Sequence, residues 1–248
     1  MEPTSNCSSA SGGVRFAGAA EIMQAIESQN LILYQTDLRG QWRPEAANAF
    51  ARRLPYARRL ALHPMRSESR ASLAGIALAL RALRRLLGRT VEPSEIVFQQ
   101  GEKPRLAAPA ALAAPAALAA ADSSHTRART ARWEEAGADF SISHAGPWVA
   151  CVALARGRVG FDLEMGTEER IADWVVREAA LKASGQGLRA LKEVEALAIH
   201  TGRLSWHGGI WHVRRLEGFE RACACLVSSI EVHEVEAHAI ALAELFDS

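Results

Sequence analysis

The clearest pattern of apolar positions lies in residues 68–90, ESRASLAGIALALRALRRLLGRT. Its large apolar side chains recur at intervals of three and four: Leu73, Ile76, Leu80, Leu83 and Leu87. This is the period of an amphipathic helix, and arginines occupy much of the other side. Gly88 provides a stop. A second helix is predicted over 172–188, ADWVVREAALKASGQGL, which ends in a glycine-rich stretch.

Shorter apolar runs, separated by turn residues, predict strands. One is expected in SEIVFQQ, just after the first helix. ADFSISHAG, PWVACVALA and RVGFDLE follow one another and are most simply an antiparallel meander. After the second helix, strands are predicted in RLSWHGGIWHVRRL, ACACLVSS and HAIALAEL. The chain is therefore expected to be α+β, with a pattern of helix and strands that occurs about twice.

The predicted elements suggest where the chain divides. Residues 1–28 begin with MEPTSNCSSASGG, which has neither a basic region nor an apolar stretch, so we expect a disordered tail and not a signal peptide. A low-complexity segment rich in Ala and Pro, at about 107–132, is expected to be an insertion or a semi-flexible connector. We expect an N-terminal subdomain over 29–157 and a C-terminal subdomain over 158–248.

Composition is compatible with this division and excludes some classes of protein. The 248 residues are 49% hydrophobic and 23% charged, enough for one large core or two small ones. No long uncharged apolar run predicts a membrane-spanning helix. The four cysteines form neither a disulfide framework, a C-x-x-C motif nor a zinc spacing, so a reducing cytoplasm is the simplest compartment. Cys223 and Cys225 are expected on one face of a buried strand.

The net charge of +1 hides an uneven distribution. Residues 39–105 hold 14 Lys/Arg against 5 Asp/Glu, whereas residues 133–248 hold 11 against 18. The basic half is either a set of solvated arginine-rich helices or a surface that receives a phosphorylated ligand or a nucleic acid. Because neither a known nucleic-acid module nor an aromatic stacking motif accompanies the charge, no nucleic-acid partner is expected.

The most informative chemistry lies in VGFDLE and in the helix that follows it. Asp162 and Glu164 are two apart on a predicted strand, so both carboxylates share one face and repel each other unless a cation lies between them. Hard oxygen ligands of this kind suit Mg²⁺. On the helix, Trp174, Glu178 and Lys182 lie along one row, which offers a third carboxylate and a cation for a phosphate oxygen. The alternative is structural: a solvated strand edge beside a surface ion pair.

Histidines supply two further candidates. His144 in FSISHAG is either a residue satisfied in a core or turn, or a hydrogen-bond donor beside a phosphate site. In HEVEAH, His233 and His238 are five apart, whereas the zinc-binding H-E-x-x-H helix needs four. We therefore reject a zinc site there.

These motifs, taken together, resemble a known family. FSISHAG, VGFDLE and WVVREAALKASGQGL are similar, in that order, to the three signature segments of the Sfp-type 4′-phosphopantetheinyl transferases, and GEKPRL is similar to the family's G-K-P-x-[LI] segment. The resemblance covers about residues 45–246. It implies two similar subdomains in a pseudo-twofold arrangement, with the active site between them.

The resemblance also implies roles for single residues. Asp162, Glu164 and Glu178 match the magnesium-binding acids, and Glu178 is in addition a candidate general base. Lys182 matches the lysine that contacts the coenzyme A pyrophosphate. The remaining matches are to coenzyme-binding positions: Ser143 and His144 near the phosphates, Lys103 near the adenine-nucleotide end, and Arg58, Arg59 and Arg66 near the 3′-phosphate.

The implied reaction is a Mg²⁺-dependent transfer of 4′-phosphopantetheine from coenzyme A to a serine of an apo acyl or peptidyl carrier protein, with Glu178, Lys182 and His144 as catalytic residues. A cytoplasmic monomer is expected. The chain departs from the family at Glu102, where a glycine is usual, and at 165–173, where nine residues replace several tens. The alternative is a degenerate member that binds coenzyme A or acts as a scaffold without turnover.

Overall fold

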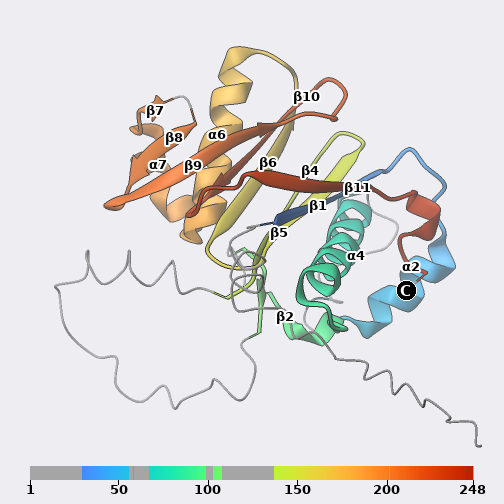
Figure 1. Cartoon of the computed structure of the whole chain (residues 1–248). Helices are drawn as coiled ribbons and strands as arrows, with labels where there is room; N and C mark the ends of the chain where they lie inside the picture. The colour runs from blue at the N-terminus through green and yellow to red at the C-terminus, as the bar shows by residue number, and fades with distance from the viewer. Residues whose placement is uncertain are drawn as a thin grey trace, which may run out of the picture.

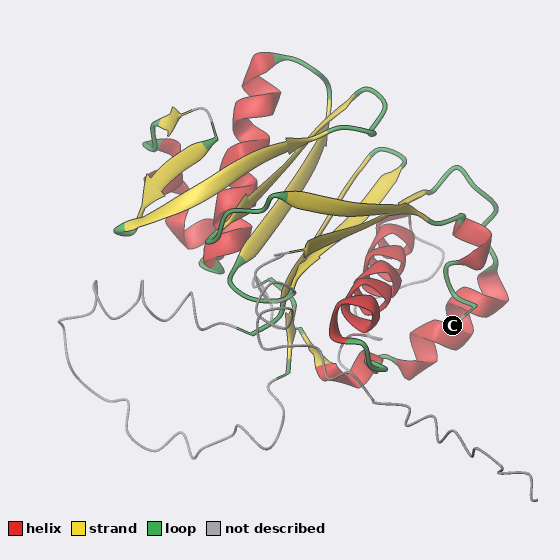
Figure 2. Cartoon of the chain, in the orientation of Figure 1, coloured by secondary structure: helices red, strands yellow, loops and turns green. Residues whose placement is uncertain are grey.

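The computed structural model describes residues 30–55, 58, 67–98, 103–107, 137–200 and 202–247. The fold is α+β, with two main sheets, a small two-stranded sheet and several helices (Figures 1 and 2). The first sheet has the order β11-β1-β5-β4, from Glu234–Ala239, Asn30–Asp37, Trp148–Leu154 and Asp139–Ala145. The second has the order β6-β10-β9-β8-β7, from Val159–Met165, Ala222–Ser228, Gly209–Leu216, Arg203–Trp206 and Ile199–His200.

The remaining elements are short apart from two helices. Helices α4 (Ser67–Leu87) and α6 (Glu169–Ser184) are the long ones, and α2 (Pro44–Arg53) and α7 (Leu191–Glu195) are shorter. A small ribbon pairs β2 (Ile96–Val97) with β3 (Arg105–Leu106). Single 3₁₀ turns occur at Pro93–Glu95, Gly187–Ala190 and Leu242–Glu244.

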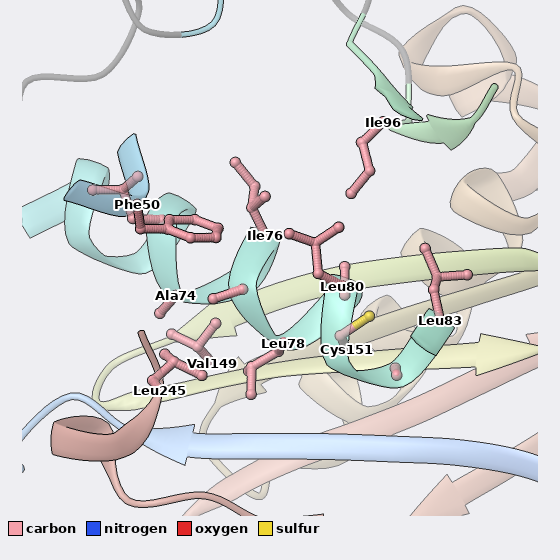
Figure 3. Packing of buried hydrophobic residues seen from close by; sticks show 14 of the residues in the cluster. Phe50, Ala74, Ile76, Leu78, Leu80, Leu83, Ile96, Val149, Cys151 and Leu245 are labelled. Atoms are coloured by element: carbon pink, nitrogen blue, oxygen red, sulfur yellow. The ribbon is translucent and has the colours of Figure 1, made fainter. Parts of the chain in front are cut away.

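Helix α4 covers the first sheet and confirms the predicted apolar stripe. Leu73, Ile76, Leu80 and Leu83 are all buried, and they belong to one apolar cluster with Val149 and Cys151 of β5. Figure 3 shows part of this cluster. A Cβ on Gly75 would lie 2.5 Å from Cγ2 of Ile142, so the helix approaches β4 closely at this glycine. The helix ends one residue before Gly88, whose φ of 61° suits glycine.

Helix α6 covers the second sheet, where it packs on β6 and β10. It begins three residues before the predicted start and ends at Ser184. The next residue, Gly185, has a φ of 69° and donates its N–H to the carbonyl oxygen of Leu181. Cys223 and Cys225 both contribute to the core beneath this helix, which confirms that they share a face.

The predicted three-stranded meander is wrong in its last strand. β4 and β5 form an antiparallel hairpin, but β6 pairs with β10 in the other sheet, with Phe161 opposite Leu226. The turn after β5 contains Gly157 with a φ of 94°, and the chain there passes from one sheet to the other. Phe161 and Leu163 then pack in a third apolar cluster, which also includes Leu31 and Leu33 of the first sheet.

The end of the chain returns to the first sheet. β11 pairs in parallel with β1, and the strand predicted in HAIALAEL occurs instead at Glu234–Ala239. Leu242, Leu245 and Phe246 then join the core under α4. Residues 234–246 therefore pack with the N-terminal part of the chain, although they lie within the predicted C-terminal subdomain.

Several predicted features lie outside the described residues. These are the tail at 1–28, nearly all of the insertion at about 107–132, and the side chains of Arg59, Arg66 and Glu102. Among the helices that the structure describes, none combines the length and apolar character needed to cross a bilayer.

Candidate functional site

The site is built where α6 lies directly against β6. A Cβ on Gly160 would be 1.9 Å from the carbonyl oxygen of Ala179 and 2.3 Å from the backbone nitrogen of Ala183. Only a glycine permits this distance between a strand and a helix backbone. The close approach brings the Glu178–Lys182 face of α6 against the acidic face of β6.

Three carboxylates meet at this contact. Asp162 and Glu164 from β6 and Glu178 from α6 each offer one oxygen, and these oxygens lie within 4.8 Å of one another. Asp162 is only 1% exposed, and its Oδ2 has no hydrogen-bond partner among the described residues. A buried carboxylate oxygen without a partner is costly, and a cation held between the three acids would satisfy it. The group can therefore hold a metal ion.

The other oxygen of Asp162 is fully engaged. Lys182 Nζ lies 2.5 Å from Oδ1, and the Ser143 hydroxyl donates to the same oxygen at 2.8 Å. Lys182 also donates to Ser143 Oγ at 3.1 Å. The Lys182 side chain is 29% exposed, so its ammonium both balances the charge of Asp162 and borders solvent.

Two of the three acids, Glu178 and Glu164, have raised pKa values. Burial raises the pKa of Glu178 above its usual range, and the neighbouring Asp162 charge adds to this, while Lys182 opposes it. The pKa of Glu164 is raised for the same reasons in the same order. Because a bound cation would favour the ionised forms, metal binding and proton release are coupled at this site.

Ser143 and His144 are neighbours in sequence but face opposite sides of β4. Ser143 is 7% exposed and contacts Asp162, whereas Ile142 packs in the core beneath α4. His144 follows the alternation of the strand and is exposed. The structure therefore joins Ser143 to the carboxylates and places His144 on the other face of the sheet.

The predicted coenzyme-binding basic residues differ in their surroundings. Lys103 Nζ donates to Asp139 Oδ2 and to the carbonyl oxygen of Val159, both at 2.6 Å, and burial lowers its pKa. Its ammonium is thus held between β4 and β6. The Arg58 guanidinium lies 4.8 Å from the centre of the Phe98 ring, and burial lowers its pKa as well.

Sequence reasoning gave no role to Arg177, which precedes Glu178. Its guanidinium donates to the carbonyl oxygens of Val194 at 2.5 Å and Glu195 at 2.8 Å, at the end of α7, and pairs with Asp173 at 2.8 Å. It therefore fixes α7 against α6, next to the acidic cluster. From the sequence, the i, i+4 spacing of Asp173 and Arg177 could have predicted the ion pair between them.

A pocket of about 580 Å³ opens at the end of β6. Pro147, Trp148 and Met165 form its apolar part, and Arg39, Glu220 and Arg221 are among its charged residues. Met165 directly follows Glu164 and points to the other side of the strand. The pocket is thus formed in part by the short loop that connects β6 to α6.

Comparison of the chain with protein-family models and with curated proteins found no match.

Proposed function

We propose that this protein transfers the 4′-phosphopantetheine arm of coenzyme A to a serine of an apo acyl or peptidyl carrier protein, with Mg²⁺, and releases adenosine 3′,5′-bisphosphate. The observation that carries the proposal is the meeting of Asp162, Glu164 and Glu178 with Lys182 at one contact between β6 and α6. Such a contact could take a cation and an anionic group together, as a pyrophosphate substrate requires.

The proposal includes a pseudo-twofold arrangement of two similar subdomains. In its support, each main sheet carries one long helix, α4 on the first and α6 on the second. β4 and β6, the edge strands of the two sheets, contact each other, and Ser143 joins Asp162 across that contact. The proposed active site therefore lies between the two sheets. We propose that the protein acts as a monomer in the cytoplasm.

Asp162, Glu164 and Glu178 would hold the Mg²⁺ ion, since Asp162 Oδ2 is buried and lacks a partner among the described residues. Bound there, Mg²⁺ would neutralise the pyrophosphate of coenzyme A and stabilise the leaving group. Ser143 and Lys182 keep the Asp162 carboxylate in place through its other oxygen.

The side chains of the site have distinct tasks in the transfer. Glu178 is the proposed general base, which removes the proton from the carrier serine. The serine oxygen attacks the β-phosphorus, and the bond from that phosphorus to the bridging oxygen breaks, so adenosine 3′,5′-bisphosphate leaves. The partly exposed Lys182 ammonium stabilises negative charge on the phosphoryl oxygens. His144 lies on the other face of β4 from Ser143, so its contact with the coenzyme phosphates stays a prediction.

The test is to incubate the protein with coenzyme A, Mg²⁺ and several apo carrier proteins, and then to weigh the carriers by mass spectrometry. We expect a gain equal to one phosphopantetheine, lost with EDTA and in Asp162→Ala. Glu169→Gln is the matched control, because Glu169 is an exposed acid in the first turn of α6. Absence of any gain, together with absence of coenzyme A binding, would overturn the proposal.

A second candidate is a coenzyme A-binding protein without turnover. The short connection from β6 to α6, at 166–168, favours it, because it leaves little chain to receive a carrier protein. Mg²⁺-dependent binding of coenzyme A without transfer to any carrier would select this candidate.

A further inference from the structure

The edge strands of the two sheets are joined by side chains. β4 is the last strand of the first sheet and β6 the first strand of the second. Asp139, Ser141 and Ser143 occupy alternate positions of β4 and therefore share one face, which is turned toward β6. We call these three residues the polar row. Their exposed fractions are 6%, 1% and 7%, so the row is enclosed.

Successive members of the polar row contact successive positions of β6. Asp139 Oδ2 accepts the N–H of Val159 at 2.9 Å. Ser141 Oγ accepts the N–H of Phe161 at 3.0 Å and lies 3.4 Å from the carbonyl oxygen of the same residue. Ser143 Oγ donates to the carboxylate of Asp162. The row thus satisfies backbone groups that an edge strand would otherwise leave unpaired, and it sets the position of β6 relative to β4.

Lys103 completes this arrangement. Its ammonium bridges Asp139 Oδ2 and the carbonyl oxygen of Val159, and the two side chains are 10% and 7% exposed. Without the lysine, Asp139 would be an enclosed carboxylate that has lost its ion-pair partner. A buried pair of this kind is costly to break on one side only.

We propose that Lys103, Asp139 and Ser141 are positioning residues, which hold β6 so that Asp162 meets Glu164 and Glu178 in a metal-binding arrangement. Phe161, held by Ser141, directly precedes Asp162. On its other side β6 lies against the α6 backbone at Gly160, so the polar row fixes the remaining freedom of the strand. This inference rests on the metal site of the proposed function, and it assigns Lys103 to the support of that site instead of to the nucleotide.

The experiment measures Mn²⁺ binding to the full chain by the electron paramagnetic resonance of free Mn²⁺. Ser141→Ala removes no charge, and we expect it to weaken Mn²⁺ binding about tenfold, the scale found for residues that orient metal ligands. Ser205→Ala, at an exposed serine of β8, is the matched control and should bind as the parent does. Circular dichroism establishes that each variant is folded at the temperature of the titration.

A double-mutant cycle tests the ion pair. Lys103→Met and Asp139→Asn should each weaken Mn²⁺ binding about tenfold. The double variant should bind Mn²⁺ no more weakly than the weaker of the two single variants, because the two residues act as a unit. The affinity for coenzyme A, measured in EDTA, should be the same in these three variants as in the parent protein. The double variant also leaves no unpaired charge, so it provides a folded protein if a single variant does not fold.

Two results with the variants would overturn the inference. One is parent-like Mn²⁺ binding in folded Ser141→Ala or in the folded double variant. The other is a loss of coenzyme A affinity in Lys103→Met alone, which would make Lys103 a nucleotide ligand. Transfer to carriers is measured separately: a parent protein that binds Mn²⁺ without transfer contradicts the proposed reaction and leaves the positioning role standing. A parent protein that binds no Mn²⁺ contradicts both.

Discussion

Lys182 Nζ and Asp162 Oδ1 lie 2.5 Å apart, across the contact between α6 and β6. The pair unites two elements that are separated along the chain by the loop at 166–168, and Asp162 is its buried member. The lysine balances one negative charge among three neighbouring carboxylates. A divalent ion would supply the additional positive charge that this group lacks.

Replacing Lys182 therefore removes the cation that pairs with the buried Asp162. Lys182→Met should lower the free energy of unfolding in EDTA by about 3 kcal/mol, the lower end of the cost of breaking a buried pair. Urea denaturation measures this. Lys192→Met, at an exposed lysine of α7, is the control and should change stability little. Equal stability of the two variants would show that the pair contributes no more than a surface ion pair.

Glu178 should destabilise the metal-free protein at neutral pH. Its pKa is raised in the folded state, so its favourable contribution is present below the unfolded pKa and is lost as pH rises through the folded pKa. Glu178→Gln removes this charge. In EDTA at about pH 8 we expect a higher melting temperature than for the parent protein, with a smaller difference at about pH 5.

Mg²⁺ should reverse the order of these two proteins. The parent protein gains stability from the bound ion, whereas Glu178→Gln loses a ligand and gains little. Thermal denaturation with and without Mg²⁺ measures both effects. A Glu178→Gln variant that is less stable than the parent protein in EDTA would contradict the repulsion between the acids.

Metal binding should weaken as the solution is acidified. Protons compete with the cation for Glu164 and Glu178, whose pKa values are both raised by burial and by Asp162. The Kd for Mn²⁺ should therefore begin to rise at a higher pH than the ordinary range of a glutamate. Mn²⁺ titrations between about pH 5 and about pH 8 measure the change. A constant Kd over that range would mean that the two glutamates are not ligands.

Gly160 should tolerate no side chain. Gly160→Ala places a methyl group within contact of the α6 backbone, so the helix must move away from β6. We expect a loss of about 3 kcal/mol in unfolding free energy, at the upper end of the usual cost of overpacking. Urea denaturation measures the loss, and the variant should also gain less stability from Mg²⁺. Gly137→Ala, where the added methyl meets no atom within 4 Å, is the control.

Local patterns were sufficient for the long helices and for the acids. The three-and-four spacing from Leu73 onward identified α4, and the spacing of Asp162 and Glu164 placed both carboxylates on one face of β6. The proximity of Glu178 and Lys182 to them depends on Gly160, whose importance lies in a contact with another element. The alternation of Asp139, Ser141 and Ser143 was visible, but an alternating strand does not reveal what its polar face meets.

For a related reason, the pairing of strands that are distant in sequence could not be predicted from local patterns. β6 was expected beside β5, its neighbour in sequence, because consecutive strands usually pair. It joins β10 instead, and the edge it turns to β4 is satisfied by side chains. The exchange leaves no mark in the hydrophobic pattern, since Phe161 and Leu163 are buried in either arrangement.

The parallel pairing of β11 with β1 affects how the protein can be made. Thr36 of β1 donates its hydroxyl proton to the carbonyl oxygen of Ile240, 204 positions later, and Leu245 and Phe246 fill the core under α4. All of the second sheet is synthesised between these partners. On the ribosome, the edge of β1 that pairs with β11 therefore stays unpaired until β11 has left the exit tunnel. The first sheet is completed only after the second has been synthesised.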